Sequence, residues 1–187
     1  MTGRTQQVQL RSHARVIGVV YLSYFATAIL GMLLSSRKLP AAVMVIVLAD
    51  ALYATLAIVL YRLFRPAQPL LALAAGLCGV AGCVTDVLHQ LRITGDSGLS
   101  PLLFFGPFCA LLGVLILRSR FLPRWLGWPL IVAGLGWLTY LNPEVAQHAK
   151  IVIFPVGFLA EFELMLWLLL RGVDEARWPE PRHLAHI

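Results

Sequence analysis

Residues 40–63 read PAAVMVIVLADALYATLAIVLYRL, an apolar run whose charged residues are Asp50 and Arg62. A helix needs roughly 20 mostly apolar residues to cross the hydrocarbon core of a bilayer, so this run is long enough to span. The aspartate lies near its middle, where a charged side chain costs at least ~2.5–3.5 kcal/mol on insertion scales. The stretch therefore predicts a membrane helix that carries a candidate functional residue.

The rest of the chain repeats this pattern. It is 59% hydrophobic and 13% charged, with a mean hydropathy of +0.81, whereas a soluble domain carries about 25% charged residues. The apolar runs are continuous rather than alternating, which excludes a β-barrel. We therefore predict an all-α, polytopic integral membrane protein that forms a single six-helix transmembrane bundle. The expected helices are about 14–34, 40–63, 69–93, 99–117, 125–141 and 149–170, and residues 171–187 form a polar C-terminal tail.

The basic residues predict the orientation of this bundle. The first run is longer than a signal-peptide core and is followed by no small-residue cleavage site, so we interpret it as a retained helix. With six helices both termini share one side, and most of the 15 basic residues fall on that side. That side holds Arg4, Arg11, Arg15, Arg62, Arg65, Arg118, Arg120, Arg124, Arg171, Arg177 and Arg182, and the other side holds Arg37, Lys38, Arg92 and Lys150. The asymmetry predicts a multi-pass protein of the cytoplasmic membrane with both termini inside.

The excess of basic residues also indicates which partners the protein can bind. A net charge of +6 is explained by topology and by attraction to anionic membrane lipids. Nucleic-acid binding would need a basic face on a soluble domain, and the sequence contains no such domain. Cys78, Cys83 and Cys109 all lie within predicted helices, where an odd number offers no disulfide framework and small core residues are expected.

Four carboxylates lie within the predicted spans, at Asp50, Asp86, Glu161 and Glu163. At a rise of ~1.5 Å per residue, Asp50 and Glu161 are both roughly 15–18 Å deep, whereas Asp86 is roughly 10 Å deep. Glu163 is two residues after Glu161 and points to another side of the helix, so we expect a structural role for it. Each acid can have one of two roles. It is either a neutral group that holds helices together or a group that exchanges protons with a substrate.

Aromatic and polar neighbours accompany these acids. His89 follows Asp86 at helical spacing and can share a proton with it, and Tyr53 follows Asp50 in the same way. Aromatic faces attract cations when desolvated, although phenylalanine is also a common filler of membrane helices. We expect Asp50, Glu161 and Asp86 to be catalytic. The substrate-binding residues expected beside them are Tyr21, Tyr24, Tyr53, His89, Phe104, Phe108 and Phe158. The sequence predicts no metal site and no cofactor.

Several segments carry a family resemblance. They are RVIGVVYL at 15–22, Asp50 followed by LYRLFRP at 60–66, RSRFLPRWLG at 118–127 running on to AGL at 133–135, and Ala160-Glu161 followed by LWLLLRG at 166–172. Together they resemble an uncharacterised bacterial family of small multi-spanning membrane proteins, domain of unknown function 4386. The resemblance implies six helices and no settled activity.

A second likeness concerns size, span content and buried acids rather than an aligned motif. In these respects the chain is similar to small bacterial membrane-bound terpene cyclases, which protonate an alkene or epoxide inside a helical bundle. The likeness implies that Asp50 or Glu161 is the proton donor and the other its partner. We therefore expect an intramembrane acid–base enzyme acting on a lipophilic, isoprenoid substrate. The alternatives are a proton-coupled small-solute transporter and a non-catalytic membrane scaffold or regulator.

Overall fold

A computed structural model of the chain describes residues 2–93, 100–174 and 177. Leu99, with which the fourth predicted run begins, lies outside the described residues, as do Arg182 and most of the predicted tail. The described start of that tail is not a free surface segment, because Gly172 and Val173 are buried. The backbone N–H of Asp174 donates to the carbonyl of Phe121 at 2.9 Å.

The described residues form six α-helices and two short 3₁₀ segments, and they contain no strand, which confirms the all-α expectation. The elements in chain order are α1 (Thr2–Ser36), α2 (Ala41–Phe64), α3 (Pro69–Gln90), α4 (Leu102–Ser119), η1 (Arg124–Leu126), α5 (Gly127–Trp137), η2 (Leu138–Leu141) and α6 (Pro143–Leu170).

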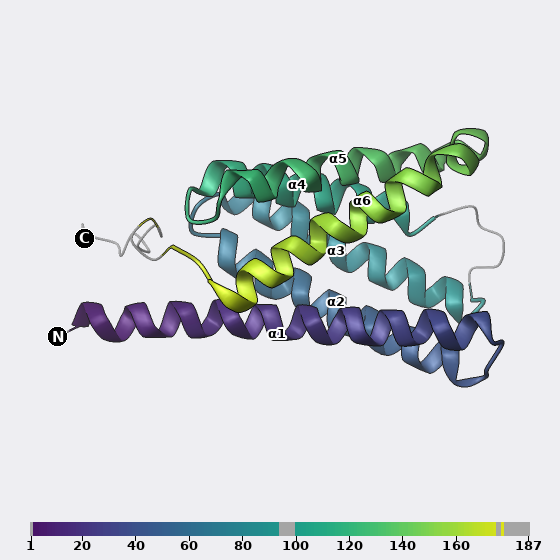
Figure 1. Cartoon of the computed structure of the whole chain (residues 1–187), viewed down its shortest axis with the longest axis horizontal. Coiled ribbons are helices and arrows are strands. Elements are labelled where there is room, and N and C mark those ends of the chain that lie inside the picture. Colours follow the sequence, from purple (N-terminus) through teal and green to yellow (C-terminus); the bar gives the residue numbers. More distant parts are fainter. Residues whose placement is uncertain (1, 94–99, 175–176, 178–187) are drawn as a thin grey trace.

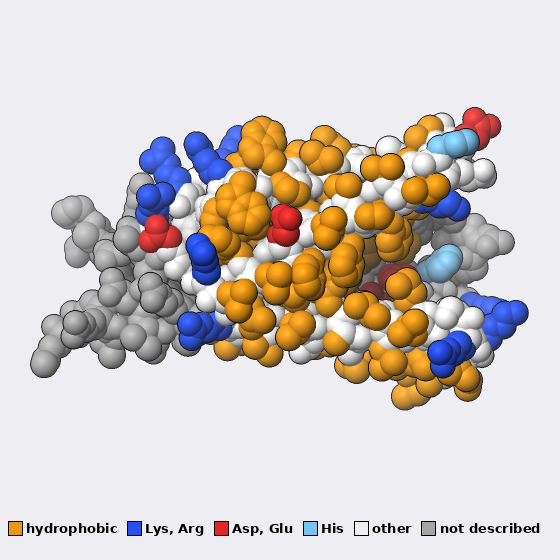
Figure 2. All heavy atoms as spheres, in the orientation of Figure 1, with side chains coloured by type: hydrophobic (Ala, Val, Ile, Leu, Met, Phe, Trp, Pro, Cys, Tyr) orange, Lys and Arg blue, Asp and Glu red, His pale blue; other side chains and the backbone are white. Residues whose placement is uncertain are grey.

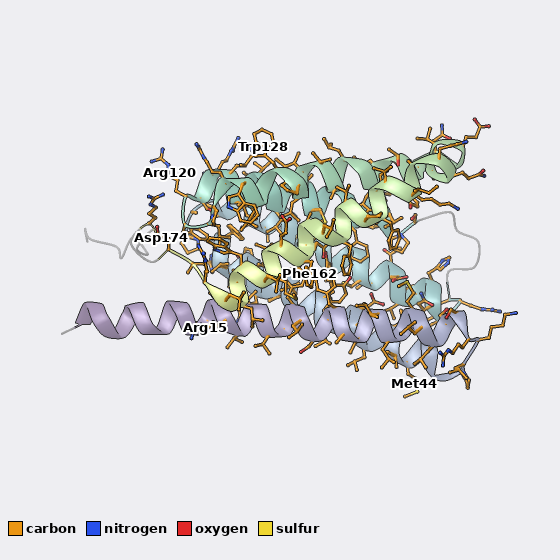
Figure 3. The ribbon with its side chains drawn as sticks, in the orientation of Figure 1. Arg15, Met44, Arg120, Trp128, Phe162 and Asp174 are labelled. Atoms are coloured by element: carbon orange, nitrogen blue, oxygen red, sulfur yellow. The ribbon has the colours of Figure 1, made fainter. Side chains whose placement is uncertain are left out.

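Five helices in the described residues, α1 to α4 and α6, are long and apolar enough to cross a membrane. The fifth predicted run is not one continuous helix: it is divided into η1, α5 and η2, and α5 has 11 residues. The outer surface is apolar, since Leu70, Met44 and Ile151 are each more than 70% exposed, and Figure 3 shows Met44 projecting away from the bundle. A soluble monomer rarely exposes such a surface, so the protein is a multi-pass helical membrane protein.

The helices pack in chain order around a closed ring. Each helix contacts the next, and α6 returns to contact α1. Figure 1 shows α6 close to α1 near the end of the bundle where α1 begins and diverging from it toward the other end. Every helix therefore has a face toward one shared interior.

Helical periodicity decides which residues of α2 face that interior. Its buried side chains recur three or four residues apart, as expected for one face of a helix; they include Asp50, Tyr53, Leu56, Ala57, Leu60 and Phe64. The carboxylate at Asp50 thus shares the interior face with apolar residues. The side chain of Asn142 caps α6 by accepting from the backbone N–H of Glu144 at 3.1 Å, and Pro143 occupies the first turn, where a proline is tolerated.

Glycines set how closely the helices approach. A methyl group added at Gly18 of α1 would lie 2.7 Å from the backbone of Leu169 in α6. One added at Gly113 of α4 would lie 2.5 Å from the carbonyl oxygen of Gly127 in α5. Small residues let membrane helices gain van der Waals contact along their backbones. These positions fix the α1–α6 and α4–α5 contacts that hold the interior in place.

Candidate functional site

Glu161 of α6 is the centre of a hydrogen-bond cluster inside the ring. The hydroxyl of Tyr21 on α1 donates to its Oε2 at 2.9 Å. The hydroxyl of Tyr53 on α2 donates to its Oε1 at 3.1 Å, and the thiol of Cys109 on α4 donates to the same oxygen at 3.4 Å. Four helices therefore converge on one carboxyl group, and both of its oxygens accept hydrogen bonds.

A cavity of about 300 Å³ lies against this cluster. Its wall is mainly aromatic and comes from all six helices; the lining residues are Tyr24, Phe25, Tyr53, Asp86, Leu102, Phe105, Trp137, Phe154, Gly157, Phe158 and Glu161. These residues lie in the half of the bundle away from the start of α1. Ligand cavities of membrane bundles are commonly built in this way, from apolar walls with a few polar groups that fix orientation.

Two carboxylates, Glu161 and Asp86, face this one cavity. The amide of Gln90 donates to Oδ1 of Asp86 at 3.4 Å, a long contact. Among the residues that the structure describes, the lining contains no lysine or arginine. The cavity therefore combines acidic groups with aromatic faces, and both attract positive charge.

The aromatic walls depend on two glycines. A methyl group at Gly82 of α3 would lie 2.6 Å from the ring of Phe105, and one at Gly157 of α6 would lie 2.7 Å from the ring of Trp137. The rings of Phe105 and Tyr53 meet edge-on at 5.3 Å between centroids. The rings of the wall thus pack closely against glycines of neighbouring helices.

The cavity opens sideways, between α1 and α6. At this gap Phe158 is 41% and Phe154 is 54% exposed, and the rings of Phe25 and Phe158 meet edge-on at 5.2 Å. Figure 2, which views the bundle from the side, shows a hollow in this part of its apolar surface.

Asp50 is placed differently from the other two predicted catalytic acids. It is buried, with 7% of its surface exposed, and its Oδ2 has no hydrogen-bond partner among the described residues. It is near enough to Asp86 for an electrostatic interaction, but it does not line the cavity. The structure therefore brings Glu161 together with Asp86 rather than with Asp50, although Asp50 and Glu161 have matching predicted depths.

The predicted substrate-binding residues divide into three groups. Tyr24, Tyr53 and Phe158 line the cavity. Tyr21 is fully buried and its hydroxyl contacts Glu161, but it does not line the cavity. Phe108 is also buried, and its ring centroid lies 5.5 Å from that of Tyr53. The remaining two, the half-buried Phe104 and the exposed His89, are also absent from the cavity lining.

Several members of the site were not among the predicted site residues, and Cys109 and Trp137 are two of them. Cys109 was interpreted as a small core residue, and its thiol contacts Glu161. Trp137 was not considered, and its ring forms part of the wall. The signal for Trp137 is Gly157, whose missing side chain provides the space for the indole. No group of three His, Cys, Asp or Glu residues in the described part of the chain is arranged to hold a metal ion.

Comparison with known proteins finds a domain match in the second half of this multi-pass membrane protein. Residues 88–172, from the end of α3 to just beyond α6, match a domain of unknown function (DUF4386) and carry that domain. The predicted resemblance to this family is therefore confirmed. The matched segment includes Phe105, Trp137 and Glu161, whereas Tyr21, Asp50 and Asp86 precede it.

A relative is known from Archaeoglobus fulgidus. The chain is 28% identical to this uncharacterized protein over 124 residues, which is 63% of this chain and 75% of the archaeal protein. No solved structure matches the chain.

Proposed function

We propose that the protein is an intramembrane acid–base enzyme that acts on a lipophilic substrate in the aromatic cavity. The observation that carries this proposal is one cavity with two carboxylates and aromatic walls, which is open on the side of the bundle. A substrate dissolved in the bilayer can enter such a cavity without crossing water. A proton taken from or given to it can be exchanged with Glu161 or Asp86.

The most concrete reaction is proton-initiated cyclisation of an isoprenoid. Addition of a proton to an alkene carbon or an epoxide oxygen leaves a carbocation, which attacks an internal alkene to close a ring. Loss of a proton from a neighbouring carbon then restores a double bond, so the reaction is an isomerisation that needs no redox cofactor. Aromatic faces such as those of Trp137 and Phe105 stabilise the positive charge while it lasts.

The surroundings of the two acids favour different roles. Glu161 accepts three hydrogen bonds, which suits a proton acceptor whose negative charge is shared with donors. Asp86 has one long contact with Gln90, which suits a proton donor. Two carboxyl groups in different environments commonly divide acid and base roles in this way. Tyr53 lines the cavity and contacts Glu161, so it can relay the departing proton.

The orientation is part of the same proposal. We infer a bacterial cytoplasmic membrane protein with six spans, η1–α5–η2 forming the fifth, and with both termini inside. The distribution of arginines supports it. Five arginines lie at or just beyond helix ends on the side of the bundle where α1 begins: Arg62, Arg118, Arg120, Arg124 and Arg171.

Purified protein in liposomes, given a panel of polyprenyl alkenes and terminal epoxides, provides the test, with cyclised products separated by chromatography. Asp86→Asn and Glu161→Gln are each expected to lower turnover by about 100-fold or more, as for loss of a general acid or base. Glu163→Gln is the control, because it removes a carboxylate outside the cavity lining. Retained activity in the Asp86→Asn/Glu161→Gln double variant contradicts the proposal.

A proton-coupled transporter is the second candidate, because the cavity lining suits a lipophilic cation as well as a carbocation. It predicts uptake of a fluorescent lipophilic amine into liposomes that is driven by a pH gradient and lost in Glu161→Gln. A scaffold or regulator predicts instead that the amide variants lose thermal stability while binding no small molecule. The product assay with the substrate panel and the uptake assay, run on the same preparations, distinguish the enzyme, the transporter and the scaffold.

A further inference from the structure

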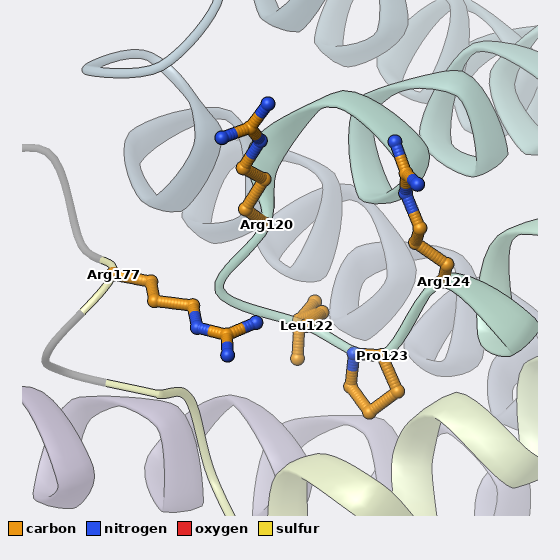
Figure 4. Close-up of a pocket in the computed structure, with 5 residues that line it drawn as sticks. All are labelled: Arg120, Leu122, Pro123, Arg124 and Arg177. Atoms are coloured by element: carbon orange, nitrogen blue, oxygen red, sulfur yellow. The ribbon is translucent and has the colours of Figure 1, made fainter.

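We propose that a second site, at the arginine-rich end of the bundle, binds the phosphate group of an anionic phospholipid. A pocket of about 460 Å³ lies there, lined by Arg120, Leu122, Pro123, Arg124 and Arg177, and we call it the arginine pocket. Figure 4 shows Arg177 reaching toward Leu122 and Pro123 from the segment after α6, with Arg120 and Arg124 on the connection between α4 and α5. It shares no lining residue with the aromatic cavity.

The backbone holds these arginines in place. Arg120 ends α4 in the left-handed conformation, with a φ of 62°, which turns the chain sharply into the connection. Arg124 begins η1, and its Nε donates to the carbonyl of Leu117 at 3.4 Å. Nε of Arg177 forms an ion pair with Oδ2 of Asp174 at 3.3 Å, and the backbone of Asp174 is bonded to Phe121. Two segments distant in sequence, residues 117–124 and 174–177, are thus tied together around one pocket.

A second hollow of about 450 Å³ extends the arginine pocket, sharing Arg120, Leu122, Pro123 and Arg177 with it and adding Arg171 and Asp174. The guanidinium of Arg171 lies 4.8 Å from the ring centroid of Trp167, in cation–π range. Among the described residues, four arginines therefore surround the two hollows against one carboxylate. Guanidinium groups present a fork of donors that matches phosphate oxygens, so the excess charge suits an anionic phosphate.

The position of the pocket favours a lipid over a phosphate in solution. Trp125 and Trp128 are 51% and 61% exposed and begin the helical segment that follows the pocket. Tryptophan prefers the headgroup level of a bilayer, and Figure 3 shows Trp128, Arg120 and Asp174 at the same end of the bundle. Leu122 and Pro123 give the pocket an apolar floor that suits the glycerol end of a lipid. Basic pockets at this level of membrane proteins bind lipid headgroups.

The test compares lipids on the intact protein in nanodiscs of phosphatidylcholine. Phosphatidylglycerol is titrated in, and bound lipid is counted by native mass spectrometry. The pocket variant is Arg120→Gln/Arg177→Gln, and the matched control is Arg62→Gln/Arg65→Gln, which removes equal charge from the same end of the bundle outside the pocket. We expect one tightly held phosphatidylglycerol in the wild type and in the control. Its affinity should fall roughly fivefold for each pocket arginine removed.

Two results with the lipids overturn the proposal, and a third comes from inorganic phosphate. One is a wild-type protein that shows no preference for phosphatidylglycerol over phosphatidylcholine, a measurement that needs no variant to fold. The other is an equal loss of affinity in the pocket and control variants, which would assign the preference to net charge. Inorganic phosphate is added in a separate arm. If millimolar phosphate displaces the lipid, the pocket takes its phosphate from solution and the lipid assignment fails.

Discussion

The two ends of the bundle differ in how α1 and α6 meet. Near the start of α1, Gly18 lets the two backbones come into contact, and Phe64, Phe121 and Leu126 are almost completely buried. In the other half α1 and α6 diverge, and the space between them contains aromatic rings and a cavity with two carboxylates. The closed half fixes the positions of the helices, so that the open half can keep polar groups around a space that is not filled by side chains.

The comparison explains where the polar groups lie. Carboxyl groups in a membrane interior usually have a partner or face a cavity. Glu161 has both, whereas Asp50 lines no cavity and its Oδ2 has no hydrogen-bond partner among the described residues. A bundle closed at both ends would leave no room for a ligand beside Glu161. The predictions below alter one half or the other, and the ordering follows the expected size of the effect on stability.

The largest effect is expected for Gly18→Ala in the closed half. The added methyl group would lie 2.7 Å from backbone atoms of Leu169, which cannot turn aside, and overpacking of this kind costs about 1–3 kcal/mol. The matched change, Gly157→Ala, meets the edge of the Trp137 ring instead, which can rotate. Thermal unfolding in detergent should show a larger loss for Gly18→Ala, whereas ligand binding should suffer more in Gly157→Ala. Equal losses of stability would contradict the distinction between the two halves.

An intermediate effect is expected for the two phenols that contact Glu161. Tyr21→Phe removes a hydrogen bond at 2.9 Å from a fully buried hydroxyl and should cost about 1 kcal/mol of stability. Tyr53→Phe removes a bond at 3.1 Å beside the cavity, so it should also lower turnover or uptake. Parallel measurement of unfolding and activity checks this. A Tyr21→Phe variant with lower activity than Tyr53→Phe would reverse the assigned roles.

The smallest effect is expected for His89→Ala. This side chain is exposed and does not line the cavity, and surface changes usually stay within about 0.5 kcal/mol. Unfolding and activity should both match the wild type. A loss of activity with unchanged stability would restore the predicted pairing of Asp86 with His89 as part of the site.

The sequence predicts the fold well because hydropathy along a chain reports directly on which segments can lie in lipid. The sequence predicts the positions of the carboxylates less completely than it predicts the helices. Spacing along a helix gives the depth of Asp50 and Glu161, but not the rotation of one helix relative to another, and that rotation puts Asp86 in the cavity wall and Asp50 behind it. The thiol of Cys109 was equally hidden, since a buried cysteine on a membrane helix resembles any small core residue until its neighbour across the ring is known.

The broken fifth segment has a consequence for how the protein fits a bilayer. A 3₁₀ segment rises ~2.0 Å per residue against ~1.5 Å for an α-helix. Laid end to end, the 3 residues of η1, the 11 of α5 and the 4 of η2 therefore reach about 30 Å, the thickness of the hydrocarbon core. The same residues wound as one α-helix would reach about 27 Å. In the proposed six-span arrangement, the tighter winding at both ends lengthens the shortest segment to match the membrane, without thinning the bilayer or adding a residue.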